Sequence, residues 1–187
     1  MAGLSDLLSV ASILAILSIV IGLSIFLMQR RADSKINRII ETQFRRQELE
    51  KKYFGTRLMA NLNLVRRNYV KLGQFLSDYL RDHSENSESK VKNFAAFNAT
   101  NLDEYLVPAM RGDLGRLIEF IDDLKLVDEL SSAFDDFASL FKDCCMDSAF
   151  GGSDSSVGEK IKAAEEWTRL VDSLLSRFGQ EIQKTVE

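Results

Sequence analysis

The hydrophobic positions begin with one unbroken run and continue as long periodic stretches. Leu7–Met28 holds 22 residues with neither a charge nor a proline. A helix of this length measures about 33 Å, close to the roughly 30 Å hydrocarbon core of a bilayer. The run therefore predicts one transmembrane helix over residues 7–28.

Charges flank this predicted span on one side only. Asp6 precedes it, whereas Arg30, Arg31, Lys35 and Arg38 follow it. The positive-inside bias then predicts an extracytoplasmic N-terminus over residues 1–6 and a cytoplasmic chain from residue 29 onward. A cleaved signal peptide is disfavoured, because its apolar core is only about 7 to 15 residues long and follows positive charge. The expectation is a single-pass signal-anchor protein.

Small residues recur on one face of the predicted span. They are Ala11, Ala15, Ser18 and Gly22, at steps of four, three and four. Small side chains let two helices approach closely in lipid, so this face is a candidate seam for another transmembrane helix or a second copy. The alternative is that such residues are common in any span.

A basic segment over residues 29–54 predicts a juxtamembrane stalk helix. Arg30, Arg31, Lys35 and Arg38 are close enough to the predicted span to meet anionic headgroups of the lipid bilayer. The later basic residues fit a solvated helix face, helped by Glu41 and Arg45 at i,i+4. A narrow apolar stripe runs along this segment through Ile36, Ile39, Ile40 and Phe44. Gly55 is expected to end or kink the helix.

The clearest periodicity in the chain follows Gly55. Apolar residues recur at alternating steps of four and three, namely Leu58, Leu62, Val65, Tyr69, Leu72, Leu76 and Tyr79. This spacing predicts a long amphipathic helix that either pairs with its own copy as a coiled coil or packs inside a bundle. Leu64, Phe75 and Leu80 widen the stripe, which favours the bundle.

The remaining residues predict further helices separated by loops. Residues 83–89 are polar and predict a loop, and Asn101–Glu104 resembles a capping box before a short helix over 102–111. A helix over 114–144 follows, and a shift of its apolar stripe near Val127–Asp128 leaves open that it is two helices meeting at a corner. A last helix is predicted over 157–182. With no strand signal, the prediction for residues 55–187 is an all-α, antiparallel bundle of four to five helices.

Charge divides the chain unevenly. Residues 1–72 hold 12 Lys/Arg against 5 Asp/Glu, whereas residues 73–187 hold 12 against 23. The acidic bundle disfavours nucleic-acid binding and fits a basic protein partner instead.

Candidate chemistry is sparse. The chain has one histidine, His83, which fits a helix C-terminus better than a metal site. The acidic doublets at 122–123, 135–136 and 165–166 lack a third acid at metal-binding spacing. Cys144 and Cys145 are adjacent, which favours free thiols, one of them in the core, over a disulfide. No catalytic, cofactor-binding or metal-binding residue is therefore predicted.

Two function classes remain from these patterns. The first is a non-enzymatic, membrane-anchored interaction or adaptor protein, such as an accessory or scaffold subunit of a membrane-associated complex with a cytoplasmic protein partner. The second is a sensor or effector in stress or defence signalling, whose bundle changes state when a ligand or partner binds. An enzyme acting on lipid is the least favoured class, because it requires a pocket with convergent polar groups.

Overall fold

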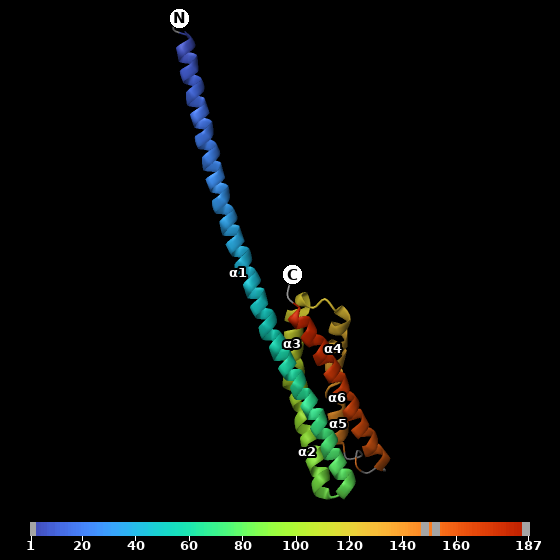
Figure 1. The fold of residues 1–187 in the computed structure, drawn as a ribbon. Coiled ribbons are helices and arrows are strands. Elements are labelled where there is room, and N and C mark those ends of the chain that lie inside the picture. Colours follow the sequence, from blue (N-terminus) through green and yellow to red (C-terminus); the bar gives the residue numbers. More distant parts are fainter. Residues whose placement is uncertain (1–2, 147–149, 151–153, 185–187) are drawn as a thin grey trace. The chain divides into compact units, whose positions relative to one another are not determined.

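The computed structural model describes residues 3–146, 150 and 154–184, with side chains for all of these except residues 3–17, 19 and 20. The described elements are α1 (Gly3–Asp82), α2 (Glu85–Asn101), the π-helical turn η1 (Leu102–Leu106), α3 (Val107–Leu117), the 3-10 turn η2 (Ile118–Phe120), α4 (Leu124–Asp136), α5 (Ser139–Cys145) and α6 (Asp154–Gln183), as Figure 1 shows. No strand occurs among these residues, so the predicted all-α class is confirmed.

The chain divides into two compact units, Met1–Leu49 and Glu50–Glu187, here called unit 1 and unit 2. The boundary lies within α1. All described residues of unit 1 belong to α1, whereas unit 2 contains the rest of α1 and every later element.

Unit 2 is an up-down-up-down bundle of four antiparallel rods. The first rod is α1 from residue 50, the second is α2, η1 and α3, the third is α4 with α5, and the fourth is α6 (Figure 1). Contacts at both ends of each neighbouring pair fix the directions. Arg57 meets Asp113 while Phe75 meets Phe94, so the first two rods are antiparallel. The predicted helical bundle is confirmed at this level.

The core of unit 2 contains the α1 stripe. Six of its seven residues are fully buried and Tyr79 is nearly so. At the centre, the Tyr69 hydroxyl donates a hydrogen bond to the Phe137 carbonyl (2.7 Å), and the Tyr69 ring stacks on Trp167 with centroids 5.6 Å apart. Burial raises the pKa of Tyr69. The structure thus places this stripe inside one chain.

The predicted break at Gly55 is wrong, because α1 continues to Asp82. A Cβ built on Gly55 would lie 3.0–3.1 Å from three side-chain carbons of Ile182 in α6. The glycine therefore makes room for close packing between α1 and α6 and does not end the helix. Tertiary packing outweighs the intrinsic helix cost of glycine, which is about 1 kcal/mol.

The predicted loop over residues 83–89 is shorter than expected. Only His83 and Ser84 separate α1 from α2. Ser84 caps α2 by accepting a hydrogen bond from the Ser87 backbone N–H (3.1 Å). The Asp82 carboxylate accepts from the Ser87 hydroxyl (2.6 Å) and from the Ser84 N–H (3.0 Å), and these bonds lower the pKa of Asp82. The polar residues that suggested a loop instead begin a helix.

The predicted capping box at Asn101–Glu104 is also wrong. Asn101 has helical dihedrals and no side-chain capping bond, so helix continues from α2 through η1 into α3. Pro108 lacks the N–H that would bond the Glu104 carbonyl in an α-helix. The backbone widens instead, and the Val107 N–H bonds the Leu102 carbonyl five residues back. The proline is thus accommodated by a π-turn without ending the helix.

The stretch predicted as a helix over residues 114–144, with a corner near Val127–Asp128 as the alternative, is divided into separate elements at other positions. It is interrupted by η2 and by Ile121, whose backbone is extended (φ −111°, ψ 115°), and again between α4 and α5. The Asp123 side chain accepts a hydrogen bond from the Leu126 N–H (3.0 Å) and so caps α4. Asp123 therefore provides the start signal that the apolar pattern alone did not reveal.

The prediction of a single-pass membrane protein is contradicted. Over the part of the chain that the structure describes, no helix carries a stretch long and apolar enough to cross a bilayer. Within the predicted segment Leu7–Met28, the side chains of residues 7–17, 19 and 20 lie outside the described ones. The signal-anchor topology and the cytoplasmic localisation are therefore withdrawn.

Candidate functional site

An apolar face without a partner element in its unit is the main surface feature of unit 1. It consists of Ile36, Ile39, Ile40 and Phe44, here called the unit 1 face, with exposed fractions of 53%, 58%, 57% and 39%. These residues recur at three- and four-residue steps, so they line one side of α1. The described part of unit 1 has no second element that packs against them. This arrangement can bind another helix by burying apolar area.

Charged residues surround the unit 1 face. Arg30, Arg31, Lys35 and Arg38 are all exposed, and Arg45 forms an exposed ion pair with Glu41 (2.6 Å) one turn away. Exposed pairs of this kind contribute little to stability, so these charges affect the choice of partner more than the fold. The predicted contact of these basic residues with lipid headgroups depended on the membrane span, so it is withdrawn together with the span.

The predicted transmembrane packing residues fall largely outside the description. The side chains of Ala11 and Ala15 are not described. Ser18 and Gly22 are exposed, and a Cβ built on Gly22 would meet nothing within 4 Å. Of this set, Gly22 therefore has open space on its described side.

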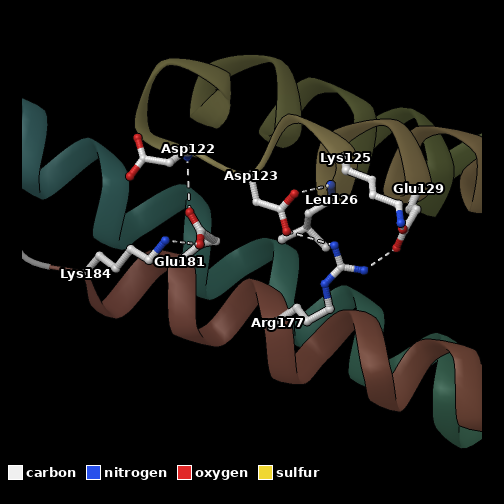
Figure 2. A network of polar contacts seen from close by, with 8 residues as sticks. All are labelled: Asp122, Asp123, Lys125, Leu126, Glu129, Arg177, Glu181 and Lys184. Atoms are coloured by element: carbon white, nitrogen blue, oxygen red, sulfur yellow. Dashed lines mark hydrogen bonds and ion pairs between the residues drawn. The ribbon is translucent and has the colours of Figure 1, made fainter.

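A polar cluster joins α4 to α6 in unit 2, as Figure 2 shows. Arg177 on α6 donates to the Asp123 carboxylate (2.8 Å) and also pairs with Glu129 on α4. Lys125 approaches the Glu129 carboxylate at 3.9 Å. The hydrogen bond from Arg177 lowers the pKa of Asp123, while the two acids raise the pKa of Arg177.

The same cluster continues toward the C-terminal end of α6. Glu181 is buried; its carboxylate pairs with Lys184 and accepts a hydrogen bond from the Asp122 backbone N–H (3.1 Å). The pairing with Lys184 lowers the pKa of Glu181 and raises that of Lys184. Lys51 donates to the Lys184 carbonyl (2.7 Å), which neutralises the negative end of the helix. All these groups have structural partners, so the cluster holds the turn before α4 against α6.

A second polar contact links α1 to α3. The fully buried Asp113 accepts two hydrogen bonds from Arg57, one from Nε at 2.7 Å and one from Nη2. The Arg57 guanidinium also lies over the rings of Tyr53 and Phe54, with its carbon 5.6 Å and 5.4 Å from their centroids. The hydrogen bonds to Asp113 raise the pKa of Arg57. This contact pairs a buried carboxylate with a half-exposed guanidinium and links two rods.

An open groove of about 690 Å³ runs between α1 and α6. Gly73 and Ala164 line its floor, where a Cβ on the glycine would lie 3.8 Å from the alanine methyl group. Asp78 and Arg169 stand at its edges, already paired with Arg81 and Glu165. Two of its lining hydroxyls bond within their own helices, Ser77 to the Gly73 carbonyl (2.8 Å) and Thr168 to the Ala164 carbonyl (2.8 Å).

The single histidine and the acidic doublet at 135–136 contact neighbouring side chains of the bundle. His83 packs its ring edge-on to Tyr79, and its Nε2 lies 3.9 Å from the Asp154 carboxylate. Asp135 pairs with Arg111 across two rods. No group of three or more His, Cys, Asp or Glu side chains is placed to hold a metal ion among the described residues.

The two cysteines are free thiols, as predicted, and Cys144 is the one in the core. Burial raises the pKa of the Cys144 thiol to about 12 and also raises that of Cys145. Both thiols are therefore protonated at neutral pH, which makes them poor nucleophiles.

Sequence reasoning missed the Arg57–Asp113 pair and the α4–α6 cluster. A signal for the first existed, because Asp113 falls between Met110 and Leu114 on the apolar face of α3. An acid at such a position requires a buried partner. The α4–α6 cluster left no comparable pattern, since its residues are far apart in the sequence.

Comparison with protein-family models, with curated proteins and with solved structures found no match.

Proposed function

We propose that this chain is a non-enzymatic interaction protein, in which the α1 segment of unit 1 docks another helix and unit 2 is the folded body that carries it. The observation that carries the proposal is the unit 1 face, whose three isoleucines are each more than half exposed.

The described part of unit 1 is a solitary helix with an exposed apolar face. Helices in water gain most of their stability from packing an apolar face, and a helix without such packing is marginal. The described residues of unit 1 form helix up to Leu49, yet no other element of that unit packs against Ile36, Ile39 or Ile40. A partner helix that covers these side chains would supply the missing packing, which supports the proposal that the segment is a binding element.

The polar groups of unit 2 support the same proposal. Its buried ionic side chains, Lys51, Asp113 and Glu181, are each engaged in contacts between distant segments. Such contacts fix the body of the bundle. This arrangement suits a carrier domain for a docking helix.

In-cell photocrosslinking of the full chain tests the proposal. A photoreactive amino acid replaces Gln43, which lies beside the unit 1 face, or Arg38 on the opposite side of α1. We expect a discrete adduct from position 43 and none from position 38. The double variant Ile36→Gln/Ile40→Gln should remove the adduct.

The matched control is Leu49→Gln. Leu49 is 68% exposed but lies away from the unit 1 face, so this variant should keep the adduct. Equal crosslinking from positions 38 and 43, or an adduct that survives the double variant, contradicts the proposal.

A further inference from the structure

Three tyrosine or phenylalanine rings are more than half exposed among the described residues of unit 2. They are Tyr53 on α1, Phe97 on α2 and Tyr105 in η1, with exposed fractions of 61%, 70% and 64%. All three belong to the first two rods. Isolated exposed apolar side chains are ordinary on a protein surface, whereas a group of them on one face marks a binding surface. Their placement relative to one another is therefore decisive.

The contacts of α1 show where its exposed side chains lie. Arg57 and Phe75 both contact the second rod and are five turns apart, so the side of α1 that carries them faces this rod. At about 100° per residue, the buried stripe of α1 lies about 100° to one side of this direction. Tyr53 and Lys71 lie about 40° to the other side, and Arg67 about 80°. These three side chains therefore stand on the outer surface of the bundle, next to the second rod.

The second rod has the matching arrangement. Phe94 and Asp113 face α1. Phe97 and Arg116, each three residues further along, lie about 60° from these positions on the side away from the core. In a continuous α-helix Tyr105 would lie closer to the direction of α1. The π-turn widens the helix here and turns Tyr105 outward, in agreement with its exposure.

Each exposed ring lies level with a cation on the neighbouring rod. The Arg57–Asp113 and Phe75–Phe94 contacts set the antiparallel register of the two rods, which run side by side in Figure 1. In this register the level pairs are Tyr53 with Arg116, Tyr105 with Arg67, and Phe97 with Lys71. These six residues are here called the outer α1–α2 face.

The charge of this face is opposite to that of the unit. Its three cations are exposed, and among the described residues none of them forms an ion pair with an acidic side chain. Arg116 lies over the Phe54 ring, 4.8 Å from the centroid. Of the acids close by, Asp78 is paired with Arg81, and Glu104 lies at the border of the face. Residues 50–187 as a whole hold 18 Lys/Arg against 24 Asp/Glu.

From this combination we infer that the outer α1–α2 face binds an acidic segment of a partner protein. Apolar side chains of the segment cover the three rings, and its carboxylates meet the three cations. Aromatic residues and arginine are the side chains that most often anchor protein interfaces. The surface lies wholly within unit 2, so the inference goes beyond the proposed docking role of unit 1 and does not depend on it.

Single-stranded nucleic acid is the other ligand that combines rings with cations. Its affinity comes mainly from many phosphate contacts, and this face offers three cations on a unit with net negative charge. A polyanion is therefore repelled at long range, whereas a short segment with a few carboxylates is repelled less. The charge balance favours the protein segment.

Selection from a library of random peptides displayed on phage, on the immobilised full chain, tests the inference. We expect the enriched peptides to combine Asp or Glu with apolar residues. Fluorescence anisotropy then measures the affinity of the most enriched peptide. Phe97→Ala/Tyr105→Ala should weaken it at least about 10-fold, as for two aromatic anchors, and Lys71→Glu about 2- to 10-fold. The loss caused by Lys71→Glu should shrink at high salt.

The matched controls lie on other rods. Lys162→Glu makes the same charge change at an exposed position of α6, and Leu124→Ala shortens an apolar side chain of α4 that is 66% exposed. Both variants should keep the affinity of the parent, and circular dichroism should show every variant folded.

The remaining outcomes overturn the inference. These are a library that yields no binder sensitive to Phe97→Ala/Tyr105→Ala, enrichment of basic peptides, and equal losses in the controls. A labelled oligouridylate that binds more tightly than the peptide, and loses affinity in the same variants, replaces the protein segment by nucleic acid. None of these results bears on the photocrosslinking at position 43, so the proposed function stands or falls separately.

Discussion

His83 ends α1 in a backbone conformation that side chains rarely adopt. Its φ is +49°, in the left-handed region, and its N–H donates to the Tyr79 carbonyl (2.8 Å). For a residue with a Cβ this region costs about 1–2 kcal/mol, whereas glycine enters it freely. The turn between α1 and α2 therefore contains local backbone strain, and the size of this strain depends on which amino acid occupies position 83.

We predict that His83→Gly raises the free energy of unfolding by about 0.5–1 kcal/mol, because it removes this strain at a helix C-terminus. His83→Val should lower it, since a β-branched side chain fits the left-handed region worst. Urea unfolding of the full chain, followed by circular dichroism, measures both. A less stable glycine variant would show that the ring contact with Tyr79 outweighs the strain.

The sequence predicts which residues are buried better than it predicts which residues form pairs. The stripe from Leu58 to Tyr79 is buried as a bundle requires, because burial repeats with the helical period. The pairing of Arg57 with Asp113 is a single contact and has no period along the sequence. The helical period therefore shows only that an acid, Asp113, lies on an apolar helix face. Its partner lies 56 residues away and is known only once the rods are packed.

At the scale of elements, the α4–α6 cluster adds polar contacts to a turn whose apolar anchor is Ile121, which is 4% exposed. Leu124, the first residue of α4, is 66% exposed, whereas Asp122 and Asp123 are tied to α6 through Glu181 and Arg177. The carboxylates of Asp123 and Glu181 have lowered pKa values. Their charged forms are therefore the ones that stabilise the folded state.

We predict that the stability of unit 2 falls with acid because of this cluster. A carboxylate whose folded pKa is depressed contributes fully above its unfolded value of about 4, and the contribution is lost as pH falls through the lower folded value. Arg177→Leu should therefore differ most from the parent at pH 7 and least near pH 2. Urea unfolding across this range measures the difference.

The matched control is Arg169→Leu on the same helix. Arg169 forms only an exposed pair with Glu165, so its loss should have a small effect at every pH. A destabilisation by Arg177→Leu that is the same at pH 2 and pH 7 contradicts the electrostatic explanation.

Element boundaries were the least predictable part of the fold. Gly55 and Pro108 both read locally as helix breakers, yet helix passes through each. The reasons are not local: Ile182 packs where the Gly55 side chain would lie, and a π-turn accommodates the missing N–H of Pro108. Ser84 and Asp123 act as N-caps only because the residues after them form the first turn of a helix. The sequence alone does not establish which residues form that turn.

At the scale of the whole molecule, the two units differ in what stabilises them. Unit 2 buries a continuous apolar core drawn from all four rods. The described part of unit 1 consists of helix alone, with its large apolar side chains exposed. Local opening is easiest where few apolar contacts are buried, so the two units should open with different free energies.

Amide hydrogen exchange of the full chain should show this difference. We predict strong protection of residues 58–79 at every protein concentration, because their packing is within one chain. Residues 29–49 should exchange much faster than residues 58–79, because no second element among the described residues of unit 1 packs against them. Equal protection of the two segments would contradict this prediction.

The π-turn at Leu102–Leu106 has a consequence for the tolerance of the chain to length changes. A π-turn is an α-helix with one additional residue, so a single-codon deletion inside it returns the helix to its usual pitch without rotating Met110 or Leu117 out of the core. The same deletion returns Pro108 to a regular α-helix, where its ring collides with a carbonyl. Shortened descendants of this gene should therefore survive only when the proline is replaced as well.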